Sequence, residues 1–525
     1  MQEITIIGSG PAGTAAALQC SFLNIKPLVL DVGIKPDFGT IDEFPNLYQH
    51  RKKESSFDLM IGKNYFGLTN ITGNHAKYPL RLTAPRMEYV TKNNELSSIN
   101  EKNFLNISSF SKGGLANAWS AGLYEYNDDD LINFPIQRKD LISYYDSLTK
   151  EIGIRGTVDD LEPYFCNNEH LSKPIPFSRN CKSLYESYLN NRIQLNRDGF
   201  YVGHSRVGVS DKNIPEDKFK NLEFWGDSND CYTPRQTLEK LESQDKVNYQ
   251  QGILIESWKE NENDIDILCK DIKTNKYFTK KTKYLFLAAG CVHTTKIVLK
   301  STKKINQPID ILDNPTLRIP LVVLKNFGLP LETTAFGFVQ LNTLWWLKDL
   351  KVQTQGTILE VTSPRRADLY EALPFSMIDN IKMVKYFLPS LLGMQLYFPG
   401  HMAKPSRLNL KSNGELSLEG FPFETPAIID KKLPAFLRSI GAWTHKSLIK
   451  PLLAGSSARY GATLPMKENP DQFQCNKEGR LSGTRGVYIL DSSNFSDLPA
   501  KNISLTIMAN SMRITEQFIN KFIVN

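Results

Sequence analysis

The feature that most constrains the fold is a glycine-rich turn close to the N-terminus. An apolar, β-branched run over residues 3–8 predicts a buried strand, and the sequence GSGPAG at residues 8–13 follows it directly. The small residues that follow the turn predict a helix, and residues 27–30 predict a second strand. A strand, a glycine turn, a helix and a strand in this order predict the first unit of a Rossmann-like dinucleotide-binding domain.

Each residue of this turn has a physical role in the prediction. Gly8 allows the tight turn, Gly10 lets the backbone approach a pyrophosphate, and Gly13 lets the helix pack closely on the strand. Asp31 ends the second strand, where a carboxylate accepts hydrogen bonds from ribose hydroxyls and disfavours a 2′-phosphate. This unit alone leaves FAD and NAD open. The predicted contacts here are Gly8, Gly10, Pro11, Ala12, Gly13 and Asp31.

Three later segments carry a resemblance to one flavoprotein family. Residues 111–119 (SKGGLANAW) contain a double glycine, residues 284–301 end a strand at Ala-Ala-Gly and begin a helix, and residues 486–509 contain GVYILDSS and AKNISLTIMA. With FPI at residues 134–136, these segments resemble, in the same order, motifs of the glucose–methanol–choline (GMC) oxidoreductases. The resemblance implies that the cofactor is FAD.

The resemblance also implies which further residues contact the cofactor. Val247 begins a strand that in members of the family lies beside the adenine. The complete set implied in this way is Gly113, Gly114, Asn117, Ala118, Val247, Ala289, Gly290, Asp491, Ser492, Asn502 and Ile503. The resemblance is weak over residues 160–230 and 310–440, so it does not name the substrate.

The segment that would carry the catalytic histidine departs from the family pattern. In GMC enzymes a histidine takes the hydroxyl proton while hydride passes to flavin N5. Matching Thr463 and Met466 to the family segment puts Arg459 at the histidine position, whereas Asn502 matches the second family position directly. Arginine stays protonated, so it is not an ordinary general base, but it can stabilise an alkoxide, a carboxylate or a reduced flavin.

Three interpretations of this departure stay open. Arg459 binds an anionic or carbonyl-bearing substrate in an enzyme of altered chemistry, or another group (Tyr460, His445 or water) takes the proton, or alcohol oxidation is lost. We expect an FAD-dependent oxidoreductase that acts on the CH–OH group of a small metabolite, with a sugar or polyol derivative as the first candidate. The electron acceptor is not indicated. The alternative is a flavin-binding protein that uses FAD structurally or in a non-redox reaction.

The positions of the motifs predict a discontinuous α/β fold. We expect a Rossmann-like FAD-binding domain with an interleaved α+β substrate-binding domain built on an antiparallel sheet. The first comprises residues 1–36, 100–155, 232–310 and 455–525, and the second comprises residues 156–231 and 311–454. Residues 37–99 are polar and are expected to form an excursion that covers the cofactor.

Composition and residue spacing argue against several other classes. The chain has a formal net charge of +7 over 525 residues and no basic stripe, so no nucleic-acid partner is expected. The seven cysteines form no CxxC pair and the seven histidines no HxH or HExxH spacing, which predicts no disulfide framework, no metal site and a cytoplasmic location. His293, at a helix start, is expected to pack or cap, and Cys291 to be buried.

One segment raises the question of membrane contact. Residues 370–400 are rich in apolar side chains but are interrupted by Asp379, Lys382 and Lys385. A spanning helix needs about 18 or more uninterrupted apolar residues, which the sequence does not contain. We therefore expect a buried helix or lid of the substrate-binding domain, with peripheral membrane contact as the alternative.

Overall fold

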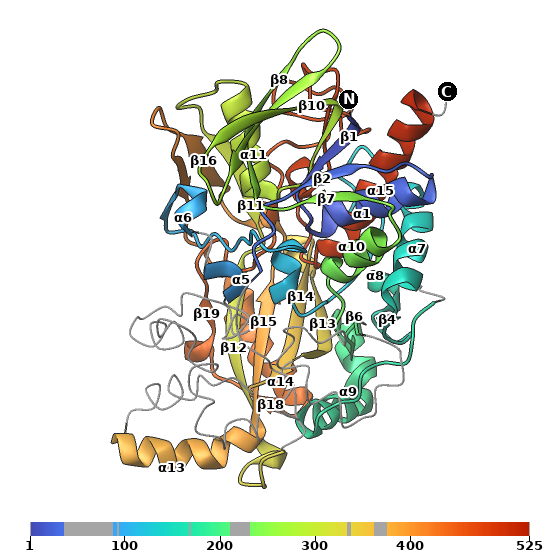
Figure 1. Cartoon of the computed structure of the whole chain (residues 1–525). Helices are drawn as coiled ribbons and strands as arrows, with labels where there is room; N and C mark the ends of the chain where they lie inside the picture. The colour runs from blue at the N-terminus through green and yellow to red at the C-terminus, as the bar shows by residue number, and fades with distance from the viewer. Residues whose placement is uncertain are drawn as a thin grey trace.

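The computed structural model describes residues 2–35, 88–91, 94–166, 170–209, 231–332, 338–361 and 375–523. Two large sheets lie one above the other in Figure 1, and segments from both ends of the chain meet in the upper one. The α/β fold with a Rossmann-like unit and an antiparallel sheet is confirmed by these two sheets.

The upper sheet has seven strands in the order β7-β2-β1-β10-β9-β8, with β21 beside β10. The strands are β1 (Gln2–Ile7), β2 (Leu28–Leu30), β7 (Asn248–Gln250), β8 (Ile253–Glu260), β9 (Ile265–Asp271), β10 (Tyr277–Leu287) and β21 (Val487–Ile489). The first half of β10 pairs antiparallel with β9, and its second half pairs parallel with β1 and β21. This sheet is thus formed by three parts of the chain that are distant in sequence: β1 and β2, β7 to β10, and β21.

Helices cover this sheet because its strands are apolar on both faces. Helix α1 (Pro11–Phe22) begins with a proline, whose fixed φ suits the first helical position. Its small residues Ala15, Ala16 and Ala17 are buried and allow close approach of its neighbours, α10 (Pro234–Ser243) and α15 (Ser504–Phe522). Helix α7 (Ile142–Ile152) packs on α15, and α11 (Cys291–Ser301) packs on β8.

The lower sheet is antiparallel, in the order β18-β12-β15-β14-β13-β5, with β19 beside β12. Its strands are β5 (Phe200–His204), β12 (Thr316–Val323), β13 (Val339–Leu347), β14 (Val352–Glu360), β15 (Leu391–Tyr397), β18 (Ala442–Trp443) and β19 (Lys450–Pro451). Apolar residues such as Ile358 and Met394 form a core with α9 (Arg179–Arg197) and α14 (Ala427–Ser439). Side chains alternate along a strand, so Thr357 and Gln395 lie on the opposite face.

A smaller sheet has the strand order β20-β11-β16-β17-β3, and β4 pairs with β6 in a separate two-stranded sheet. These strands are β3 (Ile99–Lys102), β4 (Ile154–Arg155), β6 (Val207–Gly208), β11 (Ile309–Asp313), β16 (Ser406–Leu410), β17 (Leu416–Glu419) and β20 (Tyr460–Gly461). The remaining helices of the described residues are α5 (Glu88–Thr91), α6 (Asn94–Ser97), α8 (Glu162–Phe165) and α13 (Met377–Phe387).

Several sequence-based expectations can be compared with this fold. The seven cysteines are buried, as expected for Cys291 among them. Residues 370–400 do not form one buried helix: they include the largely exposed α13 and the buried strand β15. Most of the excursion over residues 37–99 lies outside the described residues. Within the described part, no helix combines the length and apolarity needed to cross a bilayer, and no cluster of metal-ligand side chains is found.

Candidate active site

A cavity of about 300 Å³ lies where the glycine turn, the start of α11, the C-terminal segments and the end of β15 meet. Its volume falls in the range of small-molecule sites. Fifteen of the predicted residues line it: Gly8, Gly10, Pro11, Ala12, Asp31, Gly114, Ala118, Ala289, Gly290, Arg459, Tyr460, Asp491, Ser492, Asn502 and Ile503. Five others are not among its lining residues: Gly13, Gly113, Asn117, Val247 and His445.

The three glycines of the turn differ in what surrounds them. A Cβ atom added to Gly13 would lie 2.0 Å from the carbonyl oxygen of Gly8, and one added to Gly8 would lie 2.6 Å from the carbonyl oxygen of Ala288. A Cβ on Gly10 would meet nothing nearer than the Cα of Gly114, at 4.0 Å. Gly8 and Gly13 are therefore required by packing, whereas Gly10 borders open space inside the cavity.

Asp31 is held by a hydrogen-bond network at the end of β2. The Ser9 hydroxyl donates to its carboxylate and accepts a hydrogen bond of 2.9 Å from the Gly113 backbone N–H, and the Tyr249 hydroxyl donates to the same carboxylate oxygen at 3.1 Å. Burial raises the pKa of Asp31 to about 6, although the hydrogen bonds from Ser9 and Tyr249 act in the opposite direction. Ser9 lies inside the recognised motif, but Tyr249 is 218 residues away from Asp31 and carries no local signal.

Residues outside the cavity lining support it indirectly. The Asn117 side-chain amide donates to the carbonyl oxygens of Lys112 and Gly114, each at 2.8 Å, and so fixes the double-glycine loop. The side chain of Val247 is buried in the core of the upper sheet, and the cavity is instead lined by residues 253–255 of β8. Residues 253–255 belong to no recognisable motif, so nothing local in the sequence indicates that they line the cavity.

His293 and Asp491 lie at the start of α11. His293 lines the cavity with its ring 4.6 Å from that of Phe110, and burial lowers the pKa of this histidine to about 3, so it is neutral at physiological pH. The Asp491 carboxylate accepts hydrogen bonds from the Gly290 backbone N–H (2.9 Å) and the Ser493 backbone N–H (3.0 Å). Asp491 thereby joins the ends of β10 and β21.

Arg459 and Asn502 both line the cavity, and each donates a hydrogen bond to a backbone carbonyl oxygen. The Arg459 guanidinium donates to the Ala500 carbonyl oxygen at 2.9 Å and lies 3.6 Å from the ring centroid of Tyr397. The Asn502 side-chain amide donates to the Gly122 carbonyl oxygen at 2.9 Å, while its Oδ1 is buried and has no hydrogen-bond partner among the described residues. A buried cation and an unpaired amide oxygen thus line the same cavity.

The other two candidate catalytic residues lie differently. The Tyr460 hydroxyl donates to the carbonyl oxygen of Ile107, and burial holds the pKa of Tyr460 well above its ordinary value. His445 is exposed and its ring nitrogen bonds to the Ser447 hydroxyl at 2.8 Å. At neutral pH Tyr460 is therefore protonated and His445 is outside the cavity.

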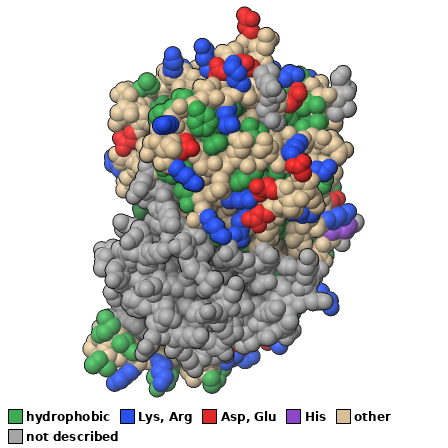
Figure 2. Space-filling model, in the orientation of Figure 1, with side chains coloured by type: hydrophobic (Ala, Val, Ile, Leu, Met, Phe, Trp, Pro, Cys, Tyr) green, Lys and Arg blue, Asp and Glu red, His purple; other side chains and the backbone are tan. Residues whose placement is uncertain are grey.

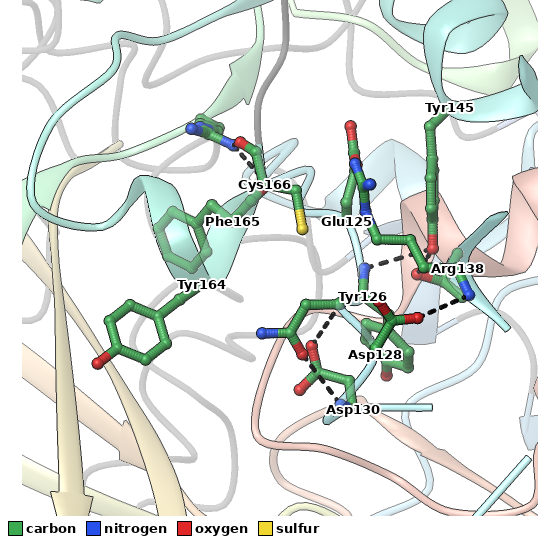
Figure 3. Close-up of polar contacts among 12 residues, drawn as sticks. Glu125, Tyr126, Asp128, Asp130, Arg138, Tyr145, Tyr164, Phe165 and Cys166 are labelled. Atoms are coloured by element: carbon green, nitrogen blue, oxygen red, sulfur yellow. Dashed lines mark hydrogen bonds and ion pairs between the residues drawn. The ribbon is translucent and has the colours of Figure 1, made fainter. Parts of the chain in front are cut away.

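Asn502 is anchored by a buried ion pair of the preceding residue. The Lys501 ammonium contacts the Asp130 carboxylate and the Tyr164 carbonyl oxygen, and the two side chains of the pair are 1% and 7% exposed. Figure 3 shows the loop that carries Asp130, whose backbone N–H donates to the Asn127 side-chain oxygen at 3.0 Å. The ion pair was missed at the sequence level because its partners are 371 residues apart.

The same loop is fixed on its other side. The Arg138 guanidinium donates to the buried Glu125 carboxylate at 2.8 Å, and the Tyr145 hydroxyl accepts from the Tyr126 backbone N–H at 3.3 Å (Figure 3). Tyr145 also bonds to the Thr506 hydroxyl, at 2.8 Å, on α15. The loop that supports Lys501 is therefore tied to two helices that cover the upper sheet.

Comparisons with known proteins bear on the fold. No sequence-family model and no curated protein matches the chain. Two solved structures are similar over 99% of this chain and 99% of their own chains, each at 11% identity. They are pyridoxine 4-oxidase from Mesorbium loti, with a TM-score of 0.59, and an FAD-dependent oxidoreductase from Chaetomium thermophilum, with a TM-score of 0.57. The chain has the fold of these two oxidoreductases. At this identity the likeness concerns the fold, and it agrees with the fold that the resemblance to GMC enzymes implied.

Proposed function

We propose that this chain is an FAD-dependent oxidoreductase of GMC type that oxidises a hydroxyl-bearing metabolite. The cofactor is supported by the fit of the cavity to a dinucleotide. Gly10 leaves open space at the N-terminus of α1, where backbone N–H groups favour a diphosphate, and the Asp31 carboxylate lies at the end of β2 for ribose hydroxyls. The flavin would supply the hydride acceptor.

The observation that carries the reaction is the unpaired Oδ1 of Asn502, which lines the same cavity as the Arg459 guanidinium. In the proposal the hydroxyl oxygen of the substrate lies between the guanidinium and the unpaired Oδ1 of Asn502. The oxygen accepts a hydrogen bond from Arg459, and its proton is donated to Asn502 until it is lost to water. Because the guanidinium is cationic, it stabilises the alkoxide and lowers the pKa of the substrate hydroxyl.

The substrate is expected to be polar and neutral or anionic. Beside Arg459, the Tyr397 hydroxyl donates to the Gln395 side-chain oxygen at 2.8 Å, and both residues line the cavity. The sheet face around them carries further buried polar residues, Asn342, Gln355 and Thr357. Sugars, polyols and pyridoxine, the compound named for one structural relative, are the first substrates to test.

The test is anaerobic bleaching of the purified yellow protein by a panel of such alcohols. We expect Arg459→Ala to keep stoichiometric FAD and to lose roughly two to three orders of magnitude in turnover, since removal of one oxyanion donor costs about 10²–10³. Added guanidinium should restore part of this activity. The rate should rise with pH without an inflection near pH 6.5, because no histidine acts as the base.

The alternative function is flavin binding without alcohol oxidation, and the arginine at the histidine position is what favours it. If dithionite bleaches the flavin but no alcohol does so, this alternative holds. Bleaching by NADH alone would instead indicate a flavoprotein that receives electrons from a nicotinamide. Unchanged turnover of Arg459→Ala would remove Arg459 from the reaction.

A further inference from the structure

Helix α13 (Met377–Phe387) projects from the end of the lower sheet that lies away from the cavity (Figure 1). Strand β15 begins at Leu391, directly after this helix region, and its other end, Tyr397, lines the cavity. Seven residues of strand correspond to roughly 20 Å. The helix is therefore separate from the candidate active site.

The helix and a neighbouring loop form one exposed apolar surface, which we call the apolar tip. The Phe327 ring packs edge-on against Phe387 at 4.9 Å, and the Gly328 backbone N–H donates to the Tyr386 carbonyl oxygen at 3.1 Å, so loop and helix are in contact. The exposed side chains of the tip are Leu324, Phe327, Leu329, Leu331, Phe375, Met377, Ile378, Ile381 and Tyr386. Isolated exposed apolar residues are common, but a contiguous group of this kind marks an interaction surface.

The tip is a formed structure. Ser376 caps α13 by accepting a hydrogen bond from the Asp379 backbone N–H, at 3.2 Å. Asn380 and Val384 are the buried residues of the helix, and the Asn380 side chain bonds to both backbone groups of Phe375. Ile378, at 67% exposure, is therefore held outward by a capped and anchored helix.

Among the described residues, the charges of the tip are mainly positive. Lys325, Lys382 and Lys385 are exposed, and within the described part of the chain none of them forms an ion pair. The one acid in the helix, Asp379, accepts a hydrogen bond of 2.7 Å from the Ser376 hydroxyl. Figure 2 shows hydrophobic and basic side chains together at the lower tip, where α13 lies in Figure 1.

The combination of exposed apolar side chains and lysines indicates whether a second copy, a partner protein or a lipid bilayer binds the tip. A symmetric contact between two copies would bring the same lysines together, and like charges repel. The tip projects, whereas a groove is what usually receives a partner's helix. Apolar side chains flanked by lysines are typical of helices that lie in the interface of an anionic bilayer, with the ammonium groups at the level of the headgroups.

We propose that the apolar tip is a peripheral docking site for an anionic lipid surface. Ile378 and Ile381 enter the boundary between headgroups and acyl chains, and Lys382 and Lys385 pair with acidic headgroups. The site holds the enzyme at a membrane through the end of the lower sheet that lies away from the cavity. It does not depend on the proposed flavin chemistry.

The test is co-sedimentation of the full-length, flavin-loaded protein with phosphatidylcholine vesicles, with and without phosphatidylserine. We expect binding to the vesicles that contain phosphatidylserine and its loss in high salt. Lys382→Gln/Lys385→Gln should weaken binding roughly thirtyfold, from two lysines near the surface. Ile378→Glu/Ile381→Glu should abolish it. Ile193→Glu, on helix α9 and 77% exposed in the wild type, is the matched control and should bind as the wild type does.

Thermal unfolding of every variant should equal that of the wild type, since all five positions are exposed. Failure of the wild-type protein to sediment with either kind of vesicle would overturn the proposal. So would equal binding by Ile378→Glu/Ile381→Glu and by the wild type. If the protein ignores vesicles but forms dimers that this double variant dissociates, the tip is covered by a second copy and the proposal is wrong.

Discussion

Replacing Gly10 by valine separates the role of the cavity from the stability of the fold. A Cβ at this position has its nearest neighbour at 4.0 Å, the Gly114 Cα, so we expect the apoprotein to fold with little change in stability. The valine side chain would occupy the space where the diphosphate approaches the N-terminus of α1. Loss of two hydrogen bonds to a charged group, at about 1.5–3 kcal/mol each, weakens FAD binding by ~3–6 kcal/mol, or roughly 10²–10⁴-fold.

The assay is calorimetric titration of the apoprotein with FAD, together with thermal unfolding of the same preparation. Gly13→Ala is the matched control, because its Cβ would lie 2.0 Å from the Gly8 carbonyl oxygen and should impair folding itself. If Gly10→Val is purified with one FAD per chain, the diphosphate does not lie against this turn, and the assignment of the cavity fails.

Two further predictions concern Asp31 and the ion pair below Asn502. The pKa of Asp31 in the free protein is about 6, and hydrogen bonds from ribose hydroxyls favour its ionised form. The affinity for FAD should therefore be constant above pH 6 and fall as the pH drops below 6. The affinity of Asp31→Asn, measured by the same titration, should not show this fall. Lys501→Met leaves the Asp130 carboxylate buried without its cation and should lower the free energy of unfolding by about 3–5 kcal/mol in urea titrations, whereas Lys501→Met/Asp130→Asn should recover much of the loss. No recovery in the double variant would show that the carboxylate is not what destabilises the single one.

The sequence was most informative where a local pattern fixes the backbone. The turn from Gly8 to Gly13 was predicted because its glycines serve a strand and a helix that adjoin it in the chain. The alternation in β14 and β15 is also local, but only the pairing of the two strands brings Thr357 and Gln395 side by side on one face. Short-range sequence patterns specify individual helices and strands, but which helix or strand each of them packs against is set by tertiary packing.

The features that were missed join residues far apart in the chain. The Tyr249 hydroxyl contacts Asp31, and the Lys501 ammonium contacts Asp130, yet neither pair has a spacing that a motif could encode. Val247 shows a second reason why residues can be misplaced from sequence. Strands β7 and β8 are separated by two residues, and Val247, just before β7, is in the core, whereas the first residues of β8 line the cavity. The sequence of residues 370–400 is partly amphipathic, but this pattern does not show which face of the helix packs against the rest of the protein.

The upper sheet has a consequence for how the polypeptide matures. Strand β1 starts at Gln2, while β21 and α15, which pack beside β10 and α1, end at Ile489 and Phe522. During synthesis, the residues of β1 and α1 must therefore wait for those of β21 and α15 before the upper sheet and its helices can form. Such late closure of distant contacts slows folding and leaves apolar edges uncovered meanwhile.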